Sequence, residues 1–317
     1  EMLNRSSLIL DNRCSKILGG TFHSFANVTL RKYSKAVGLE NNFTILDQSD
    51  SEDVINLIRS QSGLISKEKR FPNKRTLGKI FSLNVNTEIS IKAIVEDDYP
   101  HFRDDLEEIL KVSAAYKSYK RKNNLLDYDD LLIYLKIFLQ ELSPAAKSLL
   151  SKLNFVMIDE FQDTNKLQND IVKGLTQLNN NLMVVGDDSQ SIYAFRGANF
   201  KNIIDFPSQF SNVKIITLEE NFRSTQPILN FANRIVDASL EKFPKNLFTH
   251  KKSSNVPMIV AALTENLQSK FVVDKILELR EEGIPLKEIC VLFRSSFFSF
   301  DLEIELSKAN LPFQKFG

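Results

Sequence analysis

The sequence predicts an α/β fold in which helices cover parallel sheets. Two short apolar runs, Phe155–Ile158 and Leu182–Val185, each stop at acidic residues. Between these runs, apolar side chains recur at helical spacing from Leu167 to Leu178. A strand, a helix and a second strand in this order form a crossover unit, and strands that are apolar on both faces belong to a covered parallel sheet.

Acidic and amide side chains follow both apolar runs. Because the carboxyl ends of parallel strands open on one crevice, we expect Asp159, Glu160, Asp187, Asp188 and Gln190 to lie together. A carboxylate at such a place can hold Mg²⁺, directly or through its waters, and a neighbouring carboxylate can orient a water for attack on a phosphoryl group. An acidic residue after one strand often only caps the next helix. Acidic residues after two neighbouring strands favour a functional site instead.

Composition narrows the class of protein. The 317 residues predict about two domains, and 43% hydrophobic with 26% charged residues is typical of a soluble globular protein. With 41 basic and 40 acidic side chains, any nucleic-acid surface must be local. Two distant cysteines and three scattered histidines indicate neither a disulfide framework nor a zinc or iron–sulfur site. We expect a cytoplasmic protein with no membrane partner, since no apolar run approaches about 18 residues.

Four motifs carry a resemblance to a known family. DEFQDT at 159–164 and GDDSQSIYAFRG at 186–197 resemble motifs II and III of the UvrD/Rep/PcrA family of superfamily-one DNA helicases, which move 3′ to 5′. GTFHSF at 20–25 is similar to motif Ib, and LEENFRST at 218–225 is similar to motif IV. The resemblance extends from the end of motif Ia through motif IV and covers essentially the whole chain.

The resemblance implies a domain organisation. It predicts two RecA-like parallel-sheet motor domains, both incomplete, with a helical insertion in the first. The first motor domain (1A) would take 1–25 and 125–212, the insertion (1B) 26–124, and the start of the second motor domain (2A) 213–317.

The resemblance also implies ATP and Mg²⁺ as cofactors and a role for each matched residue. Asp159 would bind Mg²⁺, Glu160 would polarise the attacking water, and Gln190 would sense the γ-phosphate. Arg223 would stabilise the transferred charge from the second motor domain, and Phe222 would stack on the adenine.

By the same resemblance, the partners would be single-stranded DNA and single-strand/duplex junctions. Thr21, Phe22 and His23 would line the single-strand groove. Tyr193 and Phe195 would stack on bases, with Arg196 behind them as a structural or phosphate contact. For two of these residues a structural role is the alternative to DNA contact: Phe22 fits core packing, and His23 fits a helix cap.

The remaining segments complete the pattern. We expect helices over 24–37, 51–60, 76–95 and 101–121, and a further helix over Leu125–Leu139 that begins with a cluster of capping aspartates. Basic stretches at Lys67–Lys79 and Tyr116–Lys122 either track phosphates or are solvated helix faces. Further expected elements are a helix over Asn199–Phe210, strands at Val213–Leu218, Met258–Ala262 and Ile289–Phe293, helices over 265–282 and 299–309, and a strand start from Leu311.

A competing interpretation is a catalytically inactive DNA- or protein-binding module. The sequence contains no G-x-x-x-x-G-K-[ST] loop, which the resemblance would place before Glu1, and we expect no ATPase activity from residues 1–317 alone. The retained Asp159, Glu160 and Arg223 favour an enzyme for the parent protein. A P-loop metabolic kinase is disfavoured, because the aromatic-basic run IYAFRG has no evident use there.

Overall fold

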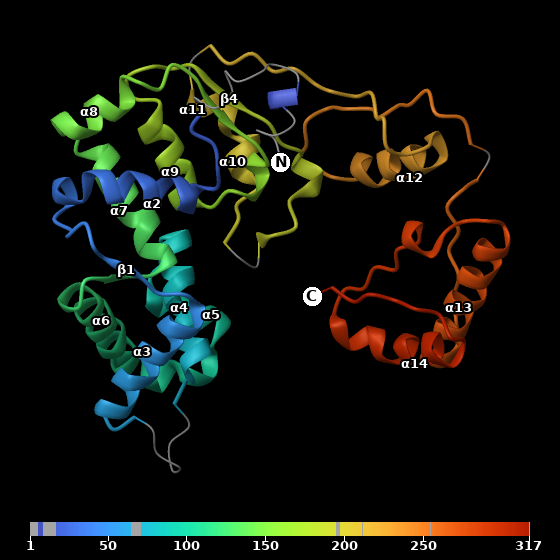
Figure 1. Ribbon diagram of the computed structural model, residues 1–317, viewed down its shortest axis with the longest axis horizontal. Coiled ribbons are helices and arrows are strands. Elements are labelled where there is room, and N and C mark those ends of the chain that lie inside the picture. The colour runs from blue at the N-terminus through green and yellow to red at the C-terminus, as the bar shows by residue number, and fades with distance from the viewer. Residues whose placement is uncertain are drawn as a thin grey trace. The chain divides into compact units, whose positions relative to one another are not determined.

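The computed structural model describes residues 6–8, 17–64, 71–194, 197–210, 212–253 and 255–316. The chain forms two compact units (Figure 1). The first consists of Glu1–Leu218 with Val236–Lys245, and the second of Glu219–Ile235 with Asn246–Gly317. The described residues are mostly helical, with two small parallel sheets. The predicted division into 1A, 1B and 2A stays a prediction.

The expected strand–helix–strand unit is present in the first compact unit. Strands β3 (Val156–Ile158) and β4 (Leu182–Val184) pair in parallel, with Ile158 opposite Val184. Helix α9 (Lys166–Leu175) connects them and begins at Asn165 with a capping box. Such a box satisfies backbone N–H groups that the first turn of a helix leaves unpaired.

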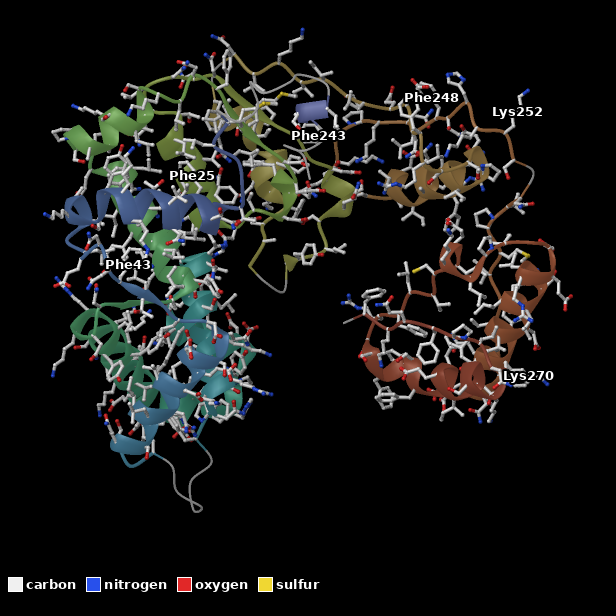
Figure 2. All side chains as sticks on the ribbon, in the orientation of Figure 1. Phe25, Phe43, Phe243, Phe248, Lys252 and Lys270 are labelled. Atoms are coloured by element: carbon white, nitrogen blue, oxygen red, sulfur yellow. The ribbon has the colours of Figure 1, made fainter. Side chains whose placement is uncertain are left out.

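Helices α2 (Phe22–Tyr33), α7 (Tyr128–Gln140), α8 (Pro144–Leu150) and α9 enclose the main core of this unit. Its centre contains Leu30, Phe43, Leu135, Phe138 and Ile171, each at most 1% exposed. Phe43 lies below α2, where the chain leaves this core (Figure 2). The Arg31 guanidinium lies 3.8 Å from the centre of its ring. The short 3₁₀ helix η2 (Ser34–Val37) continues α2, so the helical stretch ends at Val37, where the helix expected over 24–37 also ends.

A four-helix insertion has its own apolar core. It comprises α3 (Gln48–Gln61), α4 (Lys74–Thr87), α5 (Ile91–Asp98), the 3₁₀ helix η3 (Pro100–Asp105) and α6 (Leu106–Lys122). The chain enters it through β1 (Thr44–Ile45) and leaves it through β2 (Leu125–Leu126), and these two strands pair in parallel. Entry and exit therefore lie side by side (Figure 1).

The single helix expected over 76–95 is wrong, because two helices occupy this stretch. Glu88 ends α4 in the left-handed region at φ 60°, and Ser90 caps the start of α5. A left-handed residue cannot continue a right-handed helix. The helix expected over Asn199–Phe210 is likewise two short helices, α10 (Lys201–Ile204) and α11 (Phe206–Gln209), with a proline in the first turn of the second.

The aspartates at the start of α7 form the expected capping cluster. Asp127 caps the helix and completes a capping box with Asp130. The Lys120 ammonium lies 2.5 Å from both carboxylates, and the Tyr116 hydroxyl donates to Asp127 at 2.8 Å. Tyr116 and Lys120 are each only 5% exposed, so neither alternative left open for the stretch 116–122, phosphate tracking or a solvated helix face, describes these two side chains. A buried ammonium needs such partners, and these two carboxylates supply them.

The second unit is organised by α13 (Glu265–Glu281) and α14 (Phe300–Lys308), which pack through Val273, Ile276, Leu302 and Leu306. Short 3₁₀ helices η7 (Leu286–Glu288) and η8 (Ser296–Ser299) precede α14. Helix α12 (Gln226–Asp237) contains the boundary between the two units.

The strands expected at 213–218, 258–262 and 289–293 and the strand start expected over 311–317 are wrong: the described residues of these stretches are extended or irregular. A strand exists only with a hydrogen-bonded neighbour. No ladder forms on these runs among the described residues, and Ile259 and Leu292 are 92% and 89% exposed.

No described helix is both long enough and apolar enough to span a bilayer.

Polar contacts tie the insertion to the first core. The Asn86 amide of α4 donates to Asp129 of α7 at 2.9 Å, and the Asn165 side chain donates to Asn86 at 2.7 Å. Glu88, at the end of α4, pairs with Lys136 at 2.6 Å and with Lys166. These contacts join α4 to the N-terminal ends of α7 and α9 and to the middle of α7.

Asp129 in this junction makes folding stability depend on pH. Burial and the nearby charge of Asp127 raise the pKa of the Asp129 carboxyl from 3.8 to about 6. Hydrogen bonds from Ser82 and Asn86 lower this pKa, but their effect is smaller. A folded-state pKa above the unfolded value means that the native state binds the extra proton. This contribution to stability is therefore lost as the pH rises from about 4 to about 6.

We expect Asp129→Asn to stabilise the protein at pH 7 and to flatten this pH dependence. A shift of this size corresponds to roughly 2 to 3 kcal/mol, and Asn keeps an oxygen that can accept the hydrogen bond from Asn86. Denaturant unfolding of both proteins between pH 4 and 7.5 measures the effect. Asp104→Asn, on the surface of the insertion, is the control. Parallel pH curves for the natural protein and Asp129→Asn would contradict the assignment.

Candidate active site

The ends of β3 and β4 bring two acidic segments together. The Val185 N–H donates to the Ile158 carbonyl at 2.8 Å, and the Phe161 N–H donates to the Val185 carbonyl at 3.0 Å. The chain therefore stays paired just past both strands, at the points where Asp159–Glu160 and Gly186–Asp187 follow. The expected grouping of these acidic residues at one sheet edge is confirmed by this pairing.

Gln162 links the two segments directly. Its side chain is buried at 1% exposure in the 3₁₀ helix η4 (Phe161–Asp163). Its Nε2 donates to Glu160 Oε2 at 2.8 Å, and its Oε1 accepts from the Asp187 N–H at 3.0 Å. A buried amide that is satisfied on both sides fixes the separation of its partners. Sequence reasoning missed Gln162, although it lies inside the DEFQDT motif.

The backbone is strained at Glu160 and crowded at Gly186. Glu160 has φ 51° and ψ 44°, a left-handed conformation that costs a residue with a Cβ roughly 1 kcal/mol or more. A Cβ added at Gly186 would lie 2.5 Å from Gln162 Oε1 and 2.7 Å from Ile203 Cδ1. Strain of this kind persists where the surroundings enforce it, and it is concentrated at functional sites.

Asp187 is the centre of a second hydrogen-bonded group. It precedes the 3₁₀ helix η5 (Asp188–Gln190), and its Oδ2 accepts from Gln190 Nε2 at 2.7 Å. Lys245 pairs with Asp187 and lies 2.8 Å from Asp188. Burial opposes ionisation of Asp187, but hydrogen bonds from Lys245 and Gln190 outweigh it and hold the pKa of Asp187 below its usual value. Lys245 was not a candidate from the sequence, because it lies far along the chain from this loop.

Asp159 fits a cation ligand. Its carboxylate is exposed, and among the described residues its only hydrogen bond is from the adjacent Glu160 N–H at 3.1 Å. No described lysine or arginine forms an ion pair with it. An exposed carboxylate without a protein counter-ion suits Mg²⁺, which keeps most of its waters when it binds to proteins.

The residues expected in the DNA groove at the start of α2 have local structural roles. Thr21 caps the helix by accepting from the Ser24 N–H at 3.2 Å. Phe22 packs against two apolar clusters. His23 lies edge-on to Tyr128, with ring centres 5.7 Å apart, and burial lowers the pKa of its imidazole. Thr21 remains exposed, and contact of these residues with DNA stays a prediction.

The loop after η5 places Tyr193 at 38% exposure. The loop then returns to the motif II turn, where Ala198 forms a bridge with Asn165. Gly197, the residue before Ala198, has φ 85°, and a Cβ there would lie 3.3 Å from Thr87. Phe195 and Arg196, the other expected contacts to DNA, lie outside the described residues.

Phe222 and Arg223 belong to the second unit. Both side chains are exposed, Phe222 at 75%. Asn221 Oδ1 accepts from the Arg223 and Ser224 N–H groups at 2.9 and 2.7 Å, which forms a tight turn before α12. This turn presents the phenylalanine ring and the guanidinium to solvent.

Comparison with known proteins agrees with these motifs. The profile of the UvrD/REP helicase N-terminal domain matches residues 1–211. The chain belongs to the UvrD/REP helicase family. The profile of the UvrD-like helicase C-terminal domain matches residues 216–317. The resemblance of the motifs is thereby confirmed, and the family implies RecA-like α/β cores for both matched regions.

Relatives at moderate identity include ATP-dependent DNA helicases. The chain is 32% identical over 320 aligned residues to the ATP-dependent DNA helicase PcrA of Staphylococcus epidermidis. It is 31% identical over 320 aligned residues to the protein of the same name from Staphylococcus aureus. Each alignment covers 100% of this chain and 43% of the relative. The chain thus spans less than half the length of these relatives.

We expect Gly186→Ala to destabilise the first unit, because its Cβ has no room between Gln162 and Ile203. Overpacking of this kind costs roughly 1 to 3 kcal/mol. The control is Gly78→Ala inside α4, where the new Cβ would lie at an ordinary 3.7 Å from Ile55 and alanine favours the helix. Denaturant unfolding should show a loss for the first variant and a gain or no change for the second. Equal stability of the two variants would contradict the close approach at Gly186.

Proposed function

We propose that the intact protein is an ATP-dependent 3′–5′ DNA helicase or translocase, which couples ATP hydrolysis to movement along single-stranded DNA. The observation that carries this proposal is the Gln162 bridge, which joins Glu160 in motif II to Asp187 in motif III. Motif II supplies the groups for phosphoryl chemistry, and motif III leads into the loop with Tyr193. A fixed link between them is what coupling of hydrolysis to a DNA contact requires.

The two carboxylates of motif II would have separate roles in the hydrolytic step. Asp159 would hold Mg²⁺, which neutralises phosphate charge when it is bound. Glu160 would accept a hydrogen bond from the attacking water and orient it. The hydrogen bond from Gln162 at 2.8 Å fixes the Glu160 carboxylate, so that one of its oxygens remains for the water. Positioning by such a fixed group is the main contribution that a protein makes to phosphoryl transfer.

Gln190 and Arg223 would contact the γ-phosphate. Gln190 Nε2 is engaged by Asp187, and the side chain is exposed. The planar guanidinium of Arg223 fits phosphate oxygens bidentately and neutralises charge in a loose transition state. Phe222 beside it would stack on the adenine ring.

The DNA contact would be made by aromatic rings with a local basic residue. Tyr193 and Phe195 would receive unstacked bases, with Arg196 behind them as a structural or phosphate contact. Thr21, Phe22 and His23 would line the groove for the same DNA strand. Stacking on aromatic rings tolerates any sequence, because every base has a π face. Single-stranded DNA and its junctions with duplex are the corresponding partners.

We expect Glu160→Gln in the intact protein to retain ATP binding and to lower turnover by about 10²-fold or more, the usual scale for a positioned base. Steady-state hydrolysis with oligothymidylate and binding of a fluorescent ATP analogue measure the two effects. Glu141→Gln, an exposed residue at the end of α7, is the matched control. Turnover by Glu160→Gln within a factor of about two of the natural protein would overturn the assignment of the ATPase site.

We expect Tyr193→Ala to weaken binding of a labelled single-stranded oligonucleotide about tenfold, since a base–aromatic contact is worth roughly 1–3 kcal/mol. Tyr193→Phe keeps the π face and should bind as the natural protein does. Ile192→Ala removes an exposed apolar neighbour that has no π face and serves as control. If Tyr193→Ala lowers thermal stability while the folded protein binds DNA unchanged, the ring belongs to the core and not to a DNA site.

A further inference from the structure

The segment 236–245 returns to the candidate active site after α12. Phe243, labelled in Figure 2, packs against the cluster of Phe161, Val172, Ile203 and Phe206, and Phe161 belongs to motif II. The Phe243 N–H donates to Asp188 Oδ2 at 3.3 Å. An apolar anchor and a backbone hydrogen bond therefore fix this segment on the motif III loop, and Lys245 lies two residues beyond the anchor.

Lys245 is a nearly buried cation between two carboxylates. Its side chain is 11% exposed, and that of Asp188 is 6% exposed. Burial disfavours the charged amine, but hydrogen bonds from its ammonium to Asp187 and Asp188 keep the pKa of Lys245 above its ordinary value. A charge at this depth is stable only with its partners in place, so the three side chains hold one another in a fixed arrangement.

This arrangement fixes the orientation of the Gln190 amide. Asp187 Oδ1 accepts from the Ser189 N–H at 3.0 Å and also from Lys245, and Oδ2 accepts from Gln190 Nε2 at 2.7 Å. A rotation of the Asp187 carboxylate would break both sets of bonds together. One N–H of Nε2 is engaged by Asp187, so Gln190 keeps its second N–H for a phosphate oxygen and its Oε1, and no described protein group donates to that oxygen. An amide oxygen held in this way accepts from a water or a hydroxyl.

We propose that Lys245 is a positioning residue for ATP hydrolysis, which acts through Asp187 to hold the Gln190 Oε1 toward the attacking water. This inference rests on the proposed function, since it needs Gln190 to face the γ-phosphate. Lys245 touches neither substrate nor water in this scheme. Its contribution lies in the orientation of Gln190 alone, so it should alter turnover more than ATP affinity.

The test is a double-mutant cycle on steady-state ATP hydrolysis by the intact protein with saturating oligothymidylate. Lys245→Met alone would leave Asp188 as a buried unpaired carboxylate and could unfold the loop. The cycle is therefore built on Asp188→Asn, where the amide still accepts from the Phe243 N–H and the buried charge is gone. Lys245→Met and Gln190→Ala are added to that background singly and together. Lys245→Arg, which keeps the charge, is the conservative variant.

We expect Lys245→Met in this background to lower kcat about tenfold with a change in KM for ATP below about threefold. Adding Lys245→Met to Gln190→Ala should then have no further effect, because the two residues act through one group. Lys245→Arg should retain most of the turnover. Lys242→Met, three residues earlier on the same segment, should leave turnover unchanged.

The proposal would be overturned if Lys245→Met left kcat unchanged. It would also be overturned if the fold losses in kcat from Lys245→Met and Gln190→Ala multiplied in the double variant, as they do for independent residues. A loss of kcat that thermal unfolding explains fully, and that Lys245→Arg does not recover, would also overturn it. Failure of the proposed function gives a different pattern. In that case Glu160→Gln itself leaves hydrolysis unchanged. If Glu160→Gln is inactive while the Lys245 variants are normal, only the role of Lys245 is wrong.

Discussion

The parallel pairing of β3 with β4 is the constraint on which the candidate site depends. Three residue pairs and the two hydrogen bonds beyond them bring the ends of both strands to one edge. The turn after β3 must then approach the turn after β4 closely, which requires Gly186 and forces Glu160 into a left-handed conformation. The hydrogen bonds of Gln162 follow from this approach, because a single buried side chain can reach both turns.

The sequence predicted the parts of this arrangement that have a local signature. The two apolar runs, the helical spacing between them and the acidic residues after each run were sufficient to predict the strand–helix–strand unit and the approach of its two acidic strand ends. The capping aspartates at the start of α7 were also predictable, because Asp127 and Asp130 have the spacing of a capping box. In each case the chemistry of a few neighbouring residues determines the structure.

Features that depend on distant segments could not be predicted in this way. In the sequence, Tyr116 and Lys120 belong to a basic stretch that predicts a surface position. Their burial depends on Asp127 and Asp130, which supply their hydrogen-bond and ion-pair partners. Lys245 lies 57 residues from Asp188, and no pattern near either residue indicates their ion pair. The apolar runs after Leu218 have strand-like composition, yet strand formation depends on a neighbouring strand and not on composition.

The insertion is attached to the first unit by more than its two chain crossings. The paired strands β1 and β2 would by themselves act as a narrow hinge, about which a four-helix body could swing. The end of α4 adds a third point of attachment, through Asn86 to the cap of α9 and through Glu88 to Lys136 and Lys166. A mechanical load on the insertion is therefore also transmitted through the end of α4 to α7 and to the start of α9, and not through β1 and β2 alone.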